Sequence, residues 1–151
     1  MNRITTENYF LEIANTVAKR STCLRNQVGC VIVRDNHILT TGYNGAPQNL
    51  SHCLDIGCIR EKENIPSGTQ HELCRGVHAE QNAIIQGSLH GISLLGSVLY
   101  CTHQPCILCA KMIINAGITK IYYLNSYPDT RSLELLDEAN IKHIAYKDIT
   151  K

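Results

Sequence analysis

Two short motifs, His78-Ala79-Glu80 and Pro105-Cys106-Ile107-Leu108-Cys109, constrain this chain more than any other feature of its sequence. About one βα unit separates them, and together they supply one imidazole, two thiols and one carboxylate. A catalytic zinc ion needs three protein ligands and one open position, and thiolates with a neutral imidazole suit it. We therefore predict that His78, Cys106 and Cys109 bind a catalytic Zn²⁺ ion.

The spacing of the second motif indicates that a helix begins at the metal. Cys106 and Cys109 are three residues apart, so on a helix both side chains emerge on one face. Pro105 suits a first helical turn because its missing N–H would have no partner there. A helix N-terminus carries partial positive charge, which favours thiolate over thiol. If His78 also opens a helix, two such ends converge on the metal.

Glu80 is predicted to be catalytic. In a helix its side chain points away from that of His78, two residues earlier, so shared ligation is not expected. Zinc lowers the pKa of bound water to about 7, and a carboxylate beside it can accept and pass on the proton. The alternative is that Cys106 and Cys109 are half of a structural zinc knuckle, with His78 and Glu80 as ordinary helix residues.

Length favours one compact domain over residues 1–151, large enough to bury a core of its own. No signal peptide or run of 18 apolar residues is evident, so we expect a cytoplasmic protein that does not enter a membrane. In such a chain the 8 cysteines indicate metal ligands and buried thiols, not disulfides. A net charge of +1 and the absence of Trp argue against a nucleic-acid polymer and fit a free nucleotide.

Periodicity predicts an α/β fold with three α/β/α layers and a five-stranded mixed sheet. Metal motifs at the carboxyl ends of strands are expected in such a fold. Thr6 is the expected cap of the first helix, and Pro128 and Asp129 are expected to open the last. The predicted helices are 6–20, 78–89, 106–116 and 128–139, and the predicted strands are 28–34, 38–43, 97–102, 119–124 and 141–145.

The long connection over residues 46–77 is unusual for a compact domain unless it is functional or tied down. It contains five soft ligands: His52, Cys53, Cys58, His71 and Cys74. A second, structural zinc ion is our hypothesis, with Cys23 as a further candidate ligand. The alternative is that these are buried free thiols and surface histidines.

Several segments carry a family resemblance. These segments are the metal motifs, 28–33, Gly42-Tyr43-Asn44-Gly45-Ala46-Pro47, 78–84 and 114–118. Through them the chain resembles, over nearly its whole length, the deoxycytidylate (dCMP) deaminase family of the cytidine deaminase superfamily. The resemblance implies hydrolytic deamination of dCMP to dUMP. In that reaction zinc-bound hydroxide attacks C4, while Glu80 moves a proton to N3 and then to the leaving amine.

The resemblance also implies substrate-binding roles. Asn44 would contact the sugar or phosphate, the backbone around Ala79 would receive the base, and Tyr127 would pack near the nucleotide. Arg25 is a candidate phosphate partner. The alternative is that Arg25 is a solvated surface arginine. Within the 46–77 region, Cys23 and Cys53 best match relatives that carry a second zinc; the remaining ligands would come from Cys58, His71 and Cys74.

Regulation and assembly follow from the resemblance as well. Family members are homohexamers that dCTP activates and dTTP inhibits at a magnesium-dependent triphosphate site. Asn44, Gly45, Ala46 and Pro47 are the expected effector residues. This chain has Gln48-Asn49-Leu50 at the position where similar family members have a glycine-containing stretch. Two alternatives remain: deamination of another nucleobase substrate, such as dCTP, guanine or tRNA adenosine, and a non-catalytic zinc-stabilised binding module.

Overall fold

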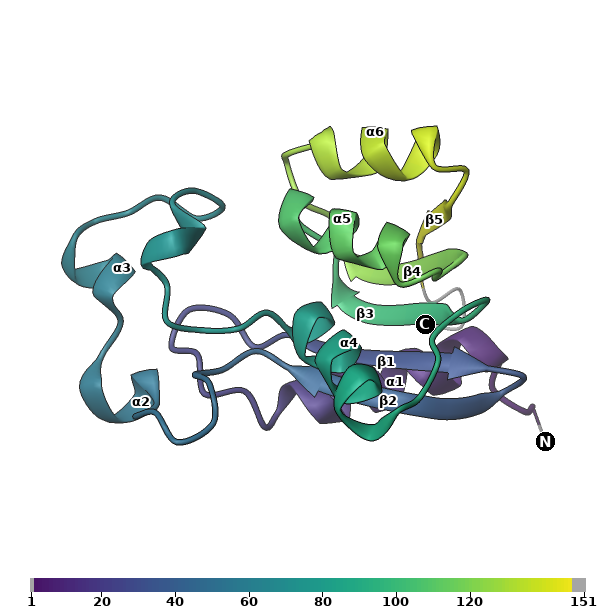
Figure 1. The fold of residues 1–151 in the computed structure, drawn as a ribbon, viewed down its shortest axis with the longest axis horizontal. Coiled ribbons are helices and arrows are strands. Elements are labelled where there is room, and N and C mark those ends of the chain that lie inside the picture. Colours follow the sequence, from purple (N-terminus) through teal and green to yellow (C-terminus); the bar gives the residue numbers. More distant parts are fainter. Residues whose placement is uncertain (1, 148–151) are drawn as a thin grey trace.

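The structure is a computed structural model that describes residues 2–147; residues 1 and 148–151 of the predicted domain lie outside the described part. Figure 1 shows the path of the chain. In chain order the elements are α1 (Thr6–Ala18), β1 (Gly29–Arg34), β2 (His37–Tyr43), α2 (Cys53–Ile56), α3 (Ile59–Lys62), the 3-10 helix η1 (His71–Leu73), α4 (Ala79–His90), β3 (Val98–His103), α5 (Ile107–Asn115), β4 (Lys120–Asn125), α6 (Arg131–Glu138) and β5 (Lys142–Ala145).

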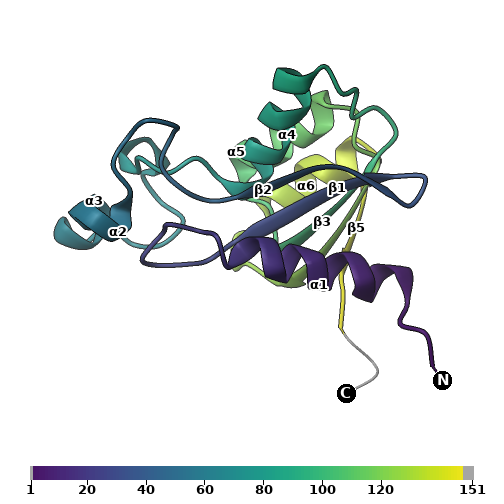
Figure 2. The ribbon, with the colours of Figure 1, turned by 90° about the horizontal axis from the view of Figure 1, so that it is seen from below.

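The strands form one five-stranded sheet in the order β2-β1-β3-β4-β5. Strand β1 is antiparallel to β2 and to β3, whereas β3, β4 and β5 are parallel. Helix α1 covers one face of the sheet, and α4, α5 and α6 cover the other (Figure 2). The three-layer α/β/α fold with a mixed sheet is therefore confirmed.

Alternation along the strands divides the core between these faces. In β3, Leu99 and Cys101 are fully buried in the cluster beneath α4 and α5, while Tyr100 packs with Phe10 of α1. The rings of Phe10 and Tyr100 lie 5.1 Å apart, and Tyr100 stacks on Tyr122 of β4 at the same separation. Strand β3 is therefore fixed from both sides, and the site residues that follow it start from a rigid position.

Gly42 brings the first metal motif against the sheet. A Cβ atom at this position would collide with the carbonyl oxygen of Ala79, the first residue of α4. Because Gly42 has no side chain, the N-terminal end of α4 can lie close to β2. The start of α4, which carries His78 and Glu80, is positioned by this contact.

The capping residue of the first helix and the start of the last helix differ from the sequence prediction. The cap of α1 is Thr5, not Thr6, because the Thr5 hydroxyl accepts a hydrogen bond from the Asn8 N–H at 3.2 Å. Helix α6 begins at Arg131, not at Pro128. Asp129 forms a turn ahead of it, in which its carboxylate accepts a hydrogen bond from the Arg131 N–H at 3.0 Å.

Candidate active site

The two metal motifs meet at the ends of two helices. His78 is the N-cap residue of α4 and Cys106 is the N-cap residue of α5. The Cys106 and Cys109 sulfurs each lie 3.4 Å from Nδ1 of His78. Among residues 2–147, this is the one group of three or more potential ligands whose donor atoms all lie within 4.8 Å of one another. The expected convergence of two helix N-termini is present.

This donor set fits a zinc ion. Hydrogen bonds with the Cys109 thiol, the larger cause, and with His78 together lower the pKa of Cys106 to about 4, although burial opposes the shift. The hydrogen bond to Cys106 in turn raises the pKa of His78. The two cysteine sulfurs and the His78 ring are therefore linked by hydrogen bonds through protons. A metal ion that binds thiolates would displace these protons. One nitrogen and two sulfur donors leave a tetrahedral ion one open position.

Glu80 lies beside these ligands without joining them. Its side chain is 4% exposed, and burial raises its pKa. One carboxylate oxygen lies 3.6 Å from the Cys109 sulfur, and the other accepts a hydrogen bond from the Cys101 thiol at 3.7 Å. A buried carboxyl group with a raised pKa next to a three-ligand metal site is suited to accepting and releasing a proton.

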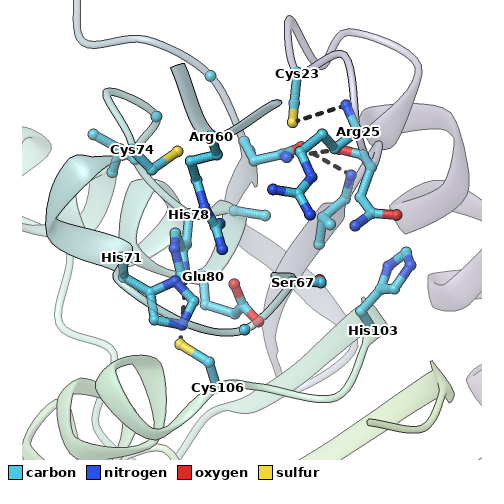
Figure 3. Close-up of a pocket in the computed structure, with 18 of the residues that line it drawn as sticks. Cys23, Arg25, Arg60, Ser67, His71, Cys74, His78, Glu80, His103 and Cys106 are labelled. Atoms are coloured by element: carbon cyan, nitrogen blue, oxygen red, sulfur yellow. Dashed lines mark hydrogen bonds between the residues drawn. The ribbon is translucent and has the colours of Figure 1, made fainter. Parts of the chain in front are cut away.

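A pocket opens above Glu80 and the metal ligands (Figure 3). Ala79, Asn44, Arg25 and Tyr127, the four predicted substrate contacts, all line it. The side chain of Asn44, however, is held by the protein. Its Oδ1 accepts hydrogen bonds from the Ser21 hydroxyl at 2.6 Å and the Val28 N–H at 2.8 Å, and its Nδ2 donates to the Asn26 carbonyl at 2.8 Å. Asn44 therefore shapes the 21–28 loop that forms one wall of the pocket.

Other lining residues were not singled out from the sequence: Arg60, Ser67, His103 and Gln104. Gln104 positions Tyr127, because its side chain accepts from the Tyr127 N–H and donates to the Asp129 carbonyl, both at 2.9 Å. His103 ends β3 three residues before Cys106, so its place next to the metal motif was a usable signal. Arg60 and Ser67 belong to a segment without periodicity and gave no such signal.

Four of the six candidate ligands of a second metal come together at one side of the pocket. Cys23, Cys53, Cys58 and Cys74 all line it. Burial raises the pKa of Cys53, and the charges of Cys58, Cys74 and Cys23 raise it further, which requires these thiols to be close. In the described residues their sulfurs are spaced more widely than the His78 group. His71 instead packs against His78, with ring centroids 5.1 Å apart.

Three of the four predicted effector residues, Gly45, Ala46 and Pro47, line a second cavity with Thr22, Asn82 and Gln86, whereas Asn44 lines the first pocket only. Thr22 and Gly45 line both cavities, so they form a wall between them. The Gly45 N–H and carbonyl pair with Val77 across an isolated bridge, at 3.1 and 2.8 Å. The wall is thereby tied to the residue that precedes His78.

An α/β/α sandwich with a His-x-Glu and Cys-x-x-Cys metal site defines the class of zinc nucleobase deaminases. The family model for the cytidine and deoxycytidylate deaminase zinc-binding region matches residues 4–125, so the chain belongs to the deoxycytidylate deaminase family. Within residues 2–147 no helix is both long enough and apolar enough to cross a bilayer.

Two curated relatives are named deoxycytidylate deaminase. The chain is 36% identical to that of Schizosaccharomyces pombe over 137 residues, which cover 90% of this chain but only 42% of the yeast protein. It is 37% identical to that of Mycobacterium phage D29 over 82% of this chain and 97% of the phage protein. The chain thus spans less than half of the yeast relative and nearly all of the phage relative.

Among solved structures, the chain is similar to the dCMP deaminase of cyanophage S-TIM5, crystallised in complex with dCMP and dUMP. The two share 30% identity with a TM-score of 0.79 over 95% of this chain and 98% of the other.

Proposed function

We propose that this protein catalyses the hydrolytic deamination of dCMP to dUMP and ammonia. The observation that carries the proposal is the buried Glu80 carboxyl group beside three clustered metal ligands at the floor of a pocket lined by two arginines. A phage relative of similar length and the cyanophage S-TIM5 enzyme, both named for this activity, support the choice of substrate.

The reaction adds water across C4 and N3 of cytosine, and the C4–N4 bond then breaks to release ammonia. His78, Cys106 and Cys109 would hold a zinc ion, which when bound lowers the pKa of a coordinated water to about 7 and so supplies the nucleophile. Glu80 would take a proton from the attacking water and deliver it to N3, and would then carry the proton of the new C4 hydroxyl group to the departing amine as the C4 carbonyl forms. Its raised pKa suits a group that must both accept and release a proton.

The substrate would lie with its base against Ala79 and its sugar beside the wall that Asn44 holds. Tyr127 would cover the nucleotide from the loop after β4, and Arg25 would face the phosphate. All four residues line the pocket, which supports this orientation. The pocket also excludes part of the solvent from Glu80, which is needed because bulk water would compete for its proton.

The test is ammonia release from dCMP by the purified, zinc-loaded chain, with deoxycytidine, dCTP, guanine and tRNA as comparison substrates. In Glu80→Gln we expect kcat to fall roughly 100- to 10,000-fold while bound zinc is retained. Glu134→Gln is the matched control, since Glu134 is an exposed helix residue on α6. Full activity of Glu80→Gln, or no turnover of dCMP by the parent chain, would end the proposal.

We also propose a second, structural zinc ion held by Cys23, Cys53, Cys58 and Cys74. Four clustered cysteines match a Cys₄ structural site. A cation would relieve the repulsion among them, which adds to the effect of burial in raising the pKa of Cys53. Metal analysis of the purified chain should give two zinc ions per chain. A value of one, with the deaminase active, contradicts this second site.

Regulation is a further part of the proposal. The cavity lined by Gly45, Ala46 and Pro47 would bind a magnesium-complexed triphosphate, with dCTP as activator and dTTP as inhibitor. The assembly would be a homohexamer. Saturation curves in dCMP, with and without each triphosphate and magnesium, test the effectors, and light scattering tests the assembly. Superimposable hyperbolic curves would exclude the regulation.

A further inference from the structure

Cys30 and Cys101 are the two cysteines that neither proposed zinc site uses. They are partners across the antiparallel strands β1 and β3, and both side chains are fully buried. Their thiols are hydrogen-bonded to each other. Neither residue is among those that line the pocket. The core beneath the site thus contains a pair of thiols that ligand binding does not explain.

Cys101 is in contact with the proposed proton carrier. Its thiol donates a hydrogen bond to Oε1 of Glu80 at 3.7 Å. Burial, the larger cause, and the hydrogen bond with Cys30 raise the pKa of Cys101 well above its usual range, so this thiol keeps its proton. Because Cys101 has one proton and gives it to Glu80, Cys30 is the donor in the bond between the two sulfurs. The three side chains therefore form a short chain of hydrogen bonds that ends at the carboxylate.

The other thiol partner of Glu80 depends on the state of the metal site. The Cys109 sulfur lies 3.6 Å from Oε2 of Glu80 and can donate only while it is a thiol. A cysteine must lose its proton to bind a metal, so Cys109 would then have none to give. Cys101 lies outside the ligand group and keeps its own. Cys101 is therefore the thiol that continues to hold Glu80 when the ligands are occupied.

Orientation matters for a carboxylate in this place. The terminal torsion of a glutamate is broad, so the group can turn unless its oxygens are held. The Glu80 backbone N–H also bonds the carboxylate, and Cys101 adds a donor from the β3 side. With Oε1 held from β3, Oε2 is directed toward α5 and the metal ligands. That is the side on which a proton must be taken up.

We propose that Cys101 is a positioning residue for Glu80: its thiol holds Oε1 against the core, so that Oε2 faces the metal site and can exchange protons there. Cys30 supports Cys101 as the next donor in the chain. The inference rests on the proposed deaminase function, and it adds a residue that acts through Glu80 without touching the substrate.

The test pairs Cys101→Ala with Cys101→Ser, because both side chains are smaller than cysteine and they differ from each other only in the hydroxyl donor. Both variants are assayed with dCMP after zinc analysis. We expect Cys101→Ala to lower kcat roughly 5- to 20-fold, at the low end for a bond to a charged group because a thiol is a weak donor. KM should stay nearly constant, since Cys101 does not line the pocket. Cys101→Ser should restore much of kcat.

Ile32→Val is the matched control for packing. Ile32 lies on β1 two residues after Cys30, is fully buried in the same core cluster, and pairs with Leu99 instead of Cys101. Removing its methyl group should lower the denaturation midpoint by an amount similar to that for Cys101→Ala. Its kcat should remain that of the parent. Chemical denaturation of all three variants measures the losses of stability.

An infrared measurement tests the contact without turnover. The difference spectrum between the parent chain and Cys101→Ala isolates the S–H stretching band of Cys101, in the zinc-free chain as well as in the loaded one. A hydrogen bond to oxygen lowers the frequency of this band. The same difference, recorded on a Glu80→Ala background, should place the band at higher frequency because the acceptor is gone.

Four results overturn the inference. These are a parent-like kcat in Cys101→Ala, equal losses of kcat in Cys101→Ala and Cys101→Ser, a loss as large in Ile32→Val, and an S–H band that does not move when Glu80 is replaced. Each of them leaves the proposed deamination intact, because that proposal depends on turnover of dCMP by the parent chain and its loss in Glu80→Gln.

Discussion

The two cysteine-containing groups of this molecule face one pocket but differ in what holds them in place. His78, Cys106 and Cys109 stand at the starts of α4 and α5, helices of 12 and 9 residues that pack on the sheet. The second group lies on the loop after α1 and on segments that include α2 and α3, of 4 residues each. Both views show α2 and α3 apart from the sheet (Figures 1 and 2).

This difference indicates which of the two sites the folded chain can form before any metal binds. The proposed catalytic ligands are held by packing, as the fully buried Cys109 indicates. Helices of one turn have almost no stability of their own, so the segment around α2 and α3 depends on cross-links between its parts. A structural zinc ion would supply them, since its binding free energy is folding free energy in such segments.

The largest expected effect separates the two sites by activity. Cys109→Ser removes a ligand from the packed site, so we expect loss of one zinc ion and a fall in kcat at least as large as for Glu80→Gln. The melting temperature should change less than the activity, because α5 keeps its packing on the sheet. Zinc analysis, kinetics and thermal unfolding of one preparation check this. Cooperative loss of the whole fold would contradict the comparison.

Cys58→Ser is the corresponding change at the second site. Removing a direct ligand should weaken binding of that zinc by more than about 100-fold. That factor is the upper end of the loss seen when a residue that only hydrogen-bonds to a metal ligand is mutated. We expect faster proteolysis within residues 46–77 while the rest of the chain stays protected. Time-resolved digestion with peptide mapping measures both regions at once. Equal sensitivity of the parent and the variant would remove the distinction.

Two glycines test the rigidity of the two regions. Gly42→Ala places a methyl group against the Ala79 carbonyl and should lower the free energy of unfolding by about 1–3 kcal/mol, with reduced activity from the displaced start of α4. Gly76→Ala, near Cys74, meets no atom closer than 3.5 Å and should be tolerated. Chemical denaturation of both variants measures the difference. Similar losses at both positions would mean that the two regions are equally constrained.

The smallest expected effect is a pH dependence from His103, next to the catalytic motif. Burial lowers the pKa of His103 below its usual range, so the folded state binds a proton less readily than the unfolded chain. This contribution to stability is present above the unfolded pKa of about 6.5 and is lost as pH falls through the folded pKa. His103→Asn should flatten the stability profile below that pH. An unchanged slope would show that other groups dominate.

The sequence predicted the packed site better than the loop. His78, Glu80, Cys106 and Cys109 lie in short motifs, where helix geometry alone relates the residues. The six candidates for a second metal were identified by type, but the path of residues 46–77 decides which of them meet, and that path has no periodic pattern. His71 accordingly lies against His78, away from the group its type suggested.

Arg60 was missed for the same physical reason. A single arginine in an irregular segment has no spacing that marks it as buried, and its place in the pocket arises only from tertiary packing. The start of α6 was placed too early because Pro128 and Asp129 are typical of a first helical turn. Asp129 instead uses its carboxylate on the Arg131 N–H, which makes the turn that precedes the helix.

Thr22 and Gly45 line both the pocket and the second cavity and so lie between them. A Cβ atom on Gly45 would come within 2.7 Å of the Thr22 hydroxyl oxygen, so neither residue has room to yield toward the other. Molecules bound on opposite sides would press on the same two residues. Communication between the chambers would then need no relay through the protein interior.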